Sequence, residues 1–288
     1  MSIGGKREAW LVTACGRKGS GKSYETTKEI EDYVRTLNRK FLILDLNNEF
    51  GQYRPILCDE RNIKLFVAQK SVEVRRIAPF KKGGIKTLDE LKNDMDVLLA
   101  HYRDGGLLIE DPALILGDSL DKEFVGAVCT LRHKSVDIIL HFQSLSKTGH
   151  PKLVANTNIL RYHRVEDTVE RSKDKFVGKI EILKIAEAIS RNKVEFGLDL
   201  QRDYEKKNPD YRINPKKQKE YEDIYNKYCR VFIWINYDNQ RLSGRFNAQD
   251  MRDGIFRYMS ENRSTTINFE KEKIDRTGTK IYKTRAKL

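Results

Sequence analysis

Gly16-Arg17-Lys18-Gly19-Ser20-Gly21-Lys22-Ser23 follows the phosphate-binding loop pattern G-x-x-x-x-G-K-[ST]. The apolar run Trp10–Cys15 comes directly before it, and the helix-compatible run Tyr24–Leu37 comes directly after it. Strand, glycine loop and helix in this order are the context in which the pattern binds phosphate. A Gly/Ser turn that matched the pattern by chance would not be expected to have a strand directly before it and a helix directly after it. The sequence therefore predicts a bound nucleoside triphosphate.

The residue types in the loop match the chemistry of a triphosphate. Glycines let backbone N–H groups converge on an anion, and the helix N-terminus adds positive potential. Lys22 is expected to reach the β- and γ-phosphates, and the Ser23 hydroxyl to take a place on Mg²⁺. The residues expected to bind ATP are Gly16, Gly19, Ser20, Gly21, Lys22 and Ser23.

The composition is strongly basic. The 288-residue chain carries 55 Lys and Arg against 42 Asp and Glu, which gives a formal net charge of +13. Apolar residues make up 39% of the chain, enough for a core, so an intrinsically disordered chain is excluded. The charge favours a polyanionic partner, either nucleic acid or an acidic membrane face. Charge that only keeps the protein in solution is the alternative, but the phosphate loop favours nucleic acid.

The cysteines and the N-terminus bear on the compartment. Cys15, Cys58, Cys129 and Cys229 lie far apart and form no C-x-x-C pair, so zinc and thioredoxin-like signatures are lacking. We expect buried thiols in a reducing compartment. Charged residues at positions 6–8 exclude a signal-peptide pattern, and no apolar run approaches the length of a membrane span. We therefore expect a soluble, cytoplasmic protein.

Apolar β-rich runs alternate with amphipathic runs over the first half of the chain. The runs expected to form strands are Ala9–Cys15, Phe41–Leu46, Lys64–Ala68, Gly106–Glu110, Asp137–Phe142 and Ile159–His163. The runs expected to form helices are Ser23–Leu37, Leu88–Arg103 and Lys122–Arg132. Near-continuous apolar strands are typical of a parallel sheet covered on both faces. The pattern predicts an α/β fold, a RecA-like P-loop NTPase with a mostly parallel sheet flanked by helices and its ligand at the carboxyl ends of the strands.

The pattern changes after His163. Residues 166–228 form a charged, helical excursion, which we expect to be exposed over Gln201–Lys227. The elements expected in this part are helices over Glu166–Lys175, Lys179–Arg191 and Ala248–Ser260, a strand over Arg230–Asn236 and a returning strand over Leu242–Phe246. We expect one ATPase domain over residues 1–263 and a basic, flexible tail over residues 264–288.

A second acidic motif follows the phosphate loop. The run Gly105–Ile109 is apolar and ends in Glu110 and Asp111. One carboxylate of such a motif holds the Mg²⁺ shell, and its neighbour polarises the attacking water. We assign Glu110 to the metal, together with Ser23, and Asp111 to the catalytic base. The exchanged assignment stays open, because Glu-Asp reverses the commoner order.

Two other strands end in polar residues. Asp45 and Glu49 come at the end of the second strand, where they either reach Mg²⁺, water or a neighbouring subunit, or form a polar loop with an Asx turn. Gln143 follows the strand Asp137–Phe142. An amide there can orient the attacking water, as a Gln does in GTPases. The alternative is a turn residue that satisfies its own backbone, and we favour the catalytic role for Gln143.

Arginines near this strand are candidates for charge stabilisation. In ring NTPases an arginine reaches across a subunit boundary to the developing charge. Arg132 is the catalytic candidate that we name, and Arg161 and Arg164 are further ones. A surface or ion-pair role is the alternative for each of the three.

Taken together, these motifs resemble a known superfamily. They are, in chain order, Gly16–Ser23, Leu44–Phe50, Leu107–Asp111, and Arg132-His133 followed by Asp137–Gln143. Their order and spacing resemble the FtsK–HerA superfamily of P-loop DNA-pumping ATPases over roughly Ala9–Arg164. The Arg-His, apolar strand and Gln succession is most similar to the genome-packaging ATPases of viruses and phages in that superfamily. The Glu-Asp order and Pro112 after it depart from the family pattern.

The resemblance implies an ATP- and Mg²⁺-dependent DNA translocase that packages a viral genome into a preformed capsid. It implies a homo-oligomeric ring with ATP between subunits and DNA in a basic channel, in the host cytoplasm or on the virion, with capsid vertex or portal proteins as partners. Three alternatives stay open: a filamentous-phage-type assembly ATPase, a P-loop phosphotransferase, and a basic nucleic-acid-binding virion protein with a nucleotide site. The lack of a membrane-length run favours packaging over extrusion.

Overall fold

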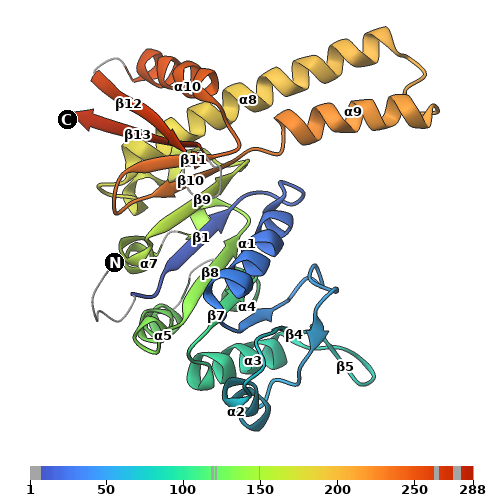
Figure 1. Cartoon of the computed structure of the whole chain (residues 1–288), viewed down its shortest axis with the longest axis vertical. Helices are drawn as coiled ribbons and strands as arrows, with labels where there is room; N and C mark the ends of the chain where they lie inside the picture. The colour runs from blue at the N-terminus through green and yellow to red at the C-terminus, as the bar shows by residue number, and fades with distance from the viewer. Residues whose placement is uncertain are drawn as a thin grey trace. The chain divides into compact units, whose positions relative to one another are not determined.

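The chain divides into two structural units (Figure 1). The computed structural model describes residues 8–117, 120, 122–148, 150–262, 266–274 and 280–287. The first unit comprises Met1–Ala14, Lys22–Gln143 and Lys147–Asn158, and the second comprises Cys15–Gly21, Ser144–Ser146 and Ile159–Leu288. The phosphate loop therefore contributes its glycines to the second unit, and Lys22 and Ser23 to the first.

The first unit is built on a parallel sheet. Its strands are, in spatial order, β1 (Leu11–Cys15), β8 (Asp137–Phe142), β7 (Gly106–Ile109), β2 (Phe41–Leu44), β4 (Val74–Ile77) and β3 (Arg54–Pro55). Every residue of β1, β2, β7 and β8 is buried, which explains their near-continuous apolar runs. Leu44 lies opposite Ile109, and Ile109 lies opposite Leu140. The residues that follow these strands therefore meet at one edge of the sheet.

Helices connect these strands. The helices are α1 (Lys22–Leu37), α2 (Glu60–Ala68), α3 (Leu88–His101), α4 (Pro112–Leu116), α5 (Lys122–His133) and α7 (Pro151–Asn156). The short helix α6 (Leu145–Thr148) belongs to both units, and a small hairpin pairs β5 (Phe80–Lys81) with β6 (Gly84–Ile85). The three helices expected in this part are confirmed, and so is the α/β fold with its mostly parallel sheet.

The expected strand over Lys64–Ala68 is wrong, because this run is the second half of helix α2. Asp59 caps the helix, and its carboxylate accepts a hydrogen bond from a backbone N–H of the first turn at 2.8 Å. Ile63 and Phe66 are buried three residues apart, while Leu65 between them is 56% exposed. That spacing is helical. The strand beside β2 is instead β4, in which two arginines obscure the apolar pattern.

The second unit has antiparallel strands and long helices. Its strands are, in spatial order, β9 (Ile159–His163), β10 (Phe232–Asn236), β11 (Arg241–Gly244), β13 (Lys280–Lys287) and β12 (Thr266–Ile274). Its helical elements are the 3₁₀ turn η1 (Val169–Lys175), α8 (Ile180–Lys207), α9 (Pro215–Tyr228) and α10 (Ala248–Glu261). The expected hairpin of β10 and β11 and the expected helix α10 are confirmed.

The charged excursion forms a helical hairpin of α8 and α9 (Figure 1). Asn214 caps α9 by accepting hydrogen bonds from the backbone N–H groups of Lys216 and Lys217. Pro215 occupies the first helical position, where no backbone donor is needed. No residue of α9 is buried, so the excursion is exposed along this helix.

The C-terminal segment contains paired strands. Residues 266–274 and 280–287 form β12 and β13, which pair antiparallel. Residues 264, 265, 275–279 and 288 lie outside the described part of the chain. The flexibility that we expect of a tail over residues 264–288, and the domain boundary at residue 263, stay predictions.

The crossing of α8 and α10 gives a stability prediction. A methyl group built on Gly254 would lie 2.3 Å from Cγ1 of Ile189 and 2.8 Å from its Cα. Because backbone atoms of α8 must shift, we expect Gly254→Ala to lower the free energy of unfolding by about 1–3 kcal/mol. Gly126 of α5 has nothing within 4 Å of such a methyl group, so Gly126→Ala should raise it by about 0.5–1 kcal/mol. Guanidinium unfolding curves of both variants check this, and equal shifts would contradict the close crossing.

Candidate nucleotide-binding site

The glycine part of the phosphate loop has the backbone that its sequence requires. Gly19 and Gly21 have φ of 75° and 91°, a region that side chains rarely adopt. A methyl group on Gly16 would lie 2.5 Å from Cβ of His163, so only glycine fits there. The Ser20 hydroxyl is buried and has no hydrogen-bond partner among the described residues. This polar atom is available to a ligand of the loop.

The rest of the pattern begins helix α1. Lys22 and Ser23 lie in its first turn, where the positive end of the helix dipole favours an anion. The Ser23 hydroxyl donates a hydrogen bond to Oε2 of Glu49. Glu49 is therefore within reach of a cation on this hydroxyl, which favours the metal role over the polar-loop role for this residue.

Glu110 follows β7 and lies deep at the sheet edge. Only 3% of its surface is exposed, and its Oε2 accepts a hydrogen bond from the backbone N–H of Asn47 at 3.1 Å. Burial, followed by repulsion from Glu49 and Asp45, raises the pKa of Glu110 to about 8. A cation beside these carboxylates would relieve the repulsion, so the cluster fits a magnesium site.

Asp111 is held in an unusual backbone conformation. Its φ of 41° and ψ of 61° are left-handed, and Pro112 after it begins α4. A residue before proline is driven out of the right-handed helical region, and Asp tolerates the left-handed one better than most residues. Nε2 of Gln143 donates a hydrogen bond to Oδ2 of Asp111 at 2.5 Å. The structure thus brings together Asp111 and Gln143, which the sequence predicted as site residues because each follows the end of a strand.

The second oxygen of Asp111 is the chemically important one. Oδ1 is buried and has no hydrogen-bond partner among the described residues. Burial raises the pKa of Asp111, while Gln143, Lys147 and Lys22 act to lower it. A carboxylate with one oxygen fixed and the other unpartnered has the arrangement of a general base.

Asp45 has a structural task at the same edge. It is fully buried, and it accepts hydrogen bonds from the backbone N–H groups of Glu49 at 2.9 Å and Phe50 at 3.2 Å. Nη1 of Arg76 pairs with its Oδ2 at 2.8 Å and also donates to Oδ1 of Asn48 at 2.7 Å. Asp45 therefore orders the loop that carries Glu49 toward Ser23.

Sequence reasoning missed two residues that support the site. Arg76 lies in β4, which was not expected as a strand. His141 of β8 forms a buried hydrogen bond of 2.7 Å between its Nε2 and Oγ1 of Thr26 in α1. A histidine two residues before Gln143 on an apolar strand was the available signal.

The structure does not bring Arg132 to this site. Its guanidinium donates hydrogen bonds to the carbonyl of Ala9 at 2.9 Å, the carbonyl of Asn156 at 3.1 Å and the carboxylate of Glu8 at 2.9 Å. Ala9 precedes β1, at the end of that strand opposite the phosphate loop. A role for Arg132 across a subunit boundary stays a prediction.

Arg161 and Arg164 differ in whether their side chains are free to stabilise charge on a phosphate. Arg161 is fully buried, and its guanidinium lies 5.5 Å from the ring centre of Trp234, so a structural role accounts for it. Arg164 is half-buried, and its carbonyl accepts a hydrogen bond from the backbone N–H of Arg17 in the phosphate loop at 2.9 Å. Of these two arginines, Arg164 remains the candidate for charge stabilisation.

The described residues contain neither a metal cage nor a membrane-spanning helix. No group of three or more His, Cys, Asp or Glu side chains there gathers around one point. Mg²⁺ keeps several waters and binds phosphate oxygens, so Ser23 with Glu110 and Glu49 fits it without such a cage. None of the helices in the described part of the chain combines the length and the apolar character needed to cross a bilayer.

Comparison with solved structures finds chains that are similar to this one, among them the following three. The genome packaging NTPase B204 from Sulfolobus turreted icosahedral virus 2, in complex with ATP-γS, is 15% identical over 83% of this chain and 98% of its own, with a TM-score of 0.50. The DNA-packaging ATPase B204 from Sulfolobus turreted icosahedral virus is 14% identical over 81% and 95%, with a TM-score of 0.46. A KaiC-like protein from Pyrococcus horikoshii is 14% identical over 55% and 74%, with a TM-score of 0.32.

Sequence comparison alone finds no relative, since no family model and no curated protein matches the chain. The first of the three structures shows that the chain has a P-loop NTPase fold. The resemblance to packaging ATPases that the motifs carry is thus confirmed at the level of fold.

The Asp111–Gln143 pair gives a prediction for hydrolysis. Asp111→Asn removes the base, so we expect kcat for ATP hydrolysis to fall by about 100-fold or more while ATP binding is kept. Gln143→Ala leaves Asp111 unheld and should lower kcat by about 10-fold. Glu123→Gln, on the exposed face of α5, is the matched control with the same charge loss. Full activity of Asp111→Asn would contradict the assignment of the base.

The raised pKa of Glu110 gives a prediction for stability. The folded state binds the proton of Glu110 more tightly than the unfolded state does, because the pKa rises from 4.5 to about 8. The stability from this group is present at low pH and is lost as pH rises through about 8. Without nucleotide and Mg²⁺, the urea midpoint should therefore fall as pH rises from 4.5 to about 8. Glu110→Gln should flatten this slope, and an unchanged slope would contradict the assignment to Glu110.

Proposed function

We propose that this protein is an ATPase that moves DNA, and that it packages a viral genome into a preformed capsid. The single observation that carries the hydrolytic part is the buried carboxylate of Asp111, held by Gln143 with one oxygen unpartnered. A passive nucleotide site has no need of a base in this position. The proposal makes Asp111 the residue that activates water.

The chemistry follows from the places of the side chains. Oδ1 of Asp111 accepts the proton of a water molecule as the water oxygen attacks the γ-phosphorus, and the bond to the β,γ-bridging oxygen breaks. Lys22 stabilises the charge on the phosphate oxygens, and the Gln143 amide keeps Asp111 oriented. Ser23 and the acids near it would hold Mg²⁺, which would supply positive charge to the phosphate oxygens.

DNA as the partner is supported by charge. The chain has a net charge of +13, and the helical hairpin carries six Lys and Arg side chains near its tip, of which Lys206 and Lys217 pair with Asp203 and Asp210. The residues of this group are Lys206, Lys207, Arg212, Lys216, Lys217 and Lys219. Phosphate contacts by Lys and Arg give binding that does not depend on base sequence, which suits a protein that moves along DNA.

Packaging is the most specific part of the proposal. It is supported by the order of the sequence motifs and by the fold shared with a viral genome packaging NTPase. By the same resemblance we propose a homo-oligomeric ring, capsid vertex proteins as partners and the host cytoplasm as the place of action.

The phosphotransferase alternative loses one residue of its lid. Such enzymes close an arginine-rich lid over the phosphates, and Arg161, Arg164 and Arg171 are the arginines that could form it here. The Arg161 guanidinium is fully buried against Trp234 and is not free to close on a substrate.

DNA-stimulated hydrolysis tests the proposal. We expect double- or single-stranded DNA to raise the ATPase rate, and the logarithm of the DNA affinity to fall linearly with the logarithm of salt concentration. Lys22→Ala should abolish hydrolysis with and without DNA. Lys28→Ala, an exposed lysine on the same helix, should leave it unchanged. An ATPase rate that ignores DNA, together with no DNA binding at low salt, would overturn the translocase.

A further inference from the structure

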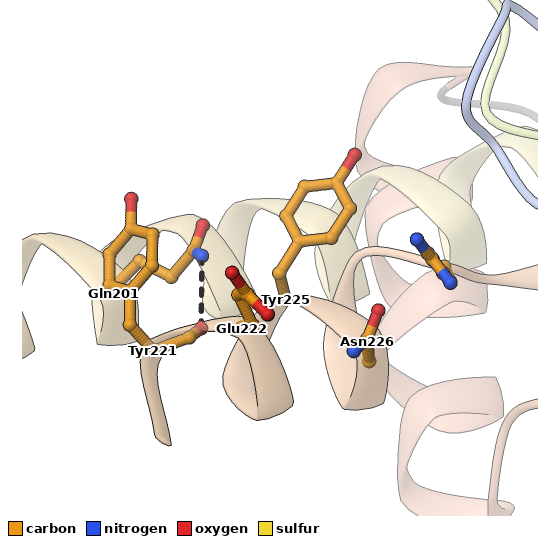
Figure 2. A pocket seen from close by; sticks show the side chains of 6 residues that line it. Gln201, Tyr221, Glu222, Tyr225 and Asn226 are labelled. Carbon is orange, nitrogen blue, oxygen red and sulfur yellow. Dashed lines mark hydrogen bonds between the residues drawn. The ribbon is translucent and has the colours of Figure 1, made fainter. Parts of the chain in front are cut away.

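A pocket in the second unit lies along the C-terminal half of α9 (Figure 2). Its cavity volume is about 300 Å³. The residues that line it are Gln201, Tyr221, Glu222, Tyr225, Asn226 and Arg230. The lining thus combines aromatic rings and amides with a carboxylate and a guanidinium. A polar and aromatic lining of this kind is suited to a nucleoside.

Arg230 connects this pocket to the phosphate loop. A methyl group built on Gly21 would lie 4.0 Å from Cδ of Arg230, so the arginine side chain lies beside the loop. Both residues belong to the second unit. Arg230 is exposed and forms no ion pair with any described residue. An unpaired guanidinium beside an anion-binding loop is placed to bind a phosphate oxygen.

The backbone around Arg230 is fixed in advance. Nη1 of Arg245 donates hydrogen bonds to the carbonyls of Asn226 at 3.1 Å and Arg230 at 3.3 Å. The backbone N–H of Arg245 donates to the carbonyl of Phe232 at 3.0 Å. The end of α9 is therefore tied to the start of β10, which fixes the backbone that carries Arg230.

Tyr225 is the ring in the pocket that is free to stack. Tyr221 already packs against Tyr211, with ring centres 4.5 Å apart, and its backbone carbonyl accepts a hydrogen bond from Gln201 at 3.3 Å. Tyr225 has no aromatic partner among the described residues, and its ring projects from α9 in Figure 2. An unpaired tyrosine ring in a polar pocket presents a face on which a base can stack.

We propose that this pocket binds the adenosine part of the nucleotide whose phosphates lie on the loop. Tyr225 stacks on the adenine, and the Asn226 amide pairs with its polar edge, as amide side chains do with adenine. The Glu222 carboxylate accepts from the ribose hydroxyls, and Arg230 binds a phosphate. Tyr225 lies on α9 and Arg230 follows the end of that helix, and both line the same pocket, so the ribose lies between the ring and the guanidinium.

The inference rests on the proposed function for its nucleotide, so the test uses two probes, ATP and inorganic tripolyphosphate, each with Mg²⁺. Tyr225→Ala should weaken ATP binding by about 10-fold, within the ordinary range of aromatic–base stacking, and leave tripolyphosphate binding unchanged. Tyr225→Phe should keep the affinity for ATP. Arg230→Ala should weaken binding of both probes, whereas Arg252→Ala, an exposed arginine of α10, should change neither.

The outcomes separate this inference from the proposed function. Wild-type affinity of Tyr225→Ala for ATP overturns the adenosine pocket, while the proposed function stands if Lys22→Ala has lost ATP. Equal loss of ATP and tripolyphosphate in Tyr225→Ala also overturns the pocket, because a stacking residue affects only the probe that has a base. A folded wild-type protein that binds neither probe overturns the proposed function itself.

Discussion

The gathering of acidic side chains at one buried edge of a parallel sheet is the constraint that governs this molecule. β2 and β7 run in register, with Leu44 opposite Ile109, so the next residue of each strand is an acid at the same edge. Asp45 and Glu110 are both buried, and Glu49 is drawn toward them by its loop. Like charges in a low dielectric repel strongly, and the surrounding structure is arranged to manage that repulsion.

Each acid is stabilised in a different way, and the difference matches a different role. Asp45 is paired with Arg76 and bonded to two backbone N–H groups, so its charge serves to order a loop. Glu110 accepts a backbone hydrogen bond, and burial together with repulsion from the neighbouring acids raises its pKa to about 8. No cationic side chain in the described part of the chain pairs with Glu110, and a bound cation would supply that positive charge. Asp111 is held by the Gln143 amide, which fixes one oxygen without neutralising the charge.

The sequence predicted the parallel strands because burial on both faces leaves an unbroken apolar run, as in β8. It predicted Asp111 and Gln143 separately as residues of one nucleotide site, because the strands before them end at the same edge of the sheet. The sequence wrongly predicted a strand over Lys64–Ala68, because this run is rich in apolar residues. The helical spacing becomes clear only from the burial of Ile63 and Phe66. The His141–Thr26 hydrogen bond joins residues 115 positions apart, and no local pattern encodes it.

The backbone conformation of Asp111 explains how the reversed Glu-Asp order can serve the site. In an extended strand, successive side chains point to opposite faces, so the second acid of the pair would be turned away from the first. Asp111 leaves the strand conformation, with φ of 41°, and Pro112 prevents its return to a right-handed helical one. This turn puts the shorter acid against Gln143 while Glu110 stays at the Asn47 loop. The arrangement favours Glu110 for the metal and Asp111 for the base, since only Asp111 combines a fixed oxygen with an unpartnered one.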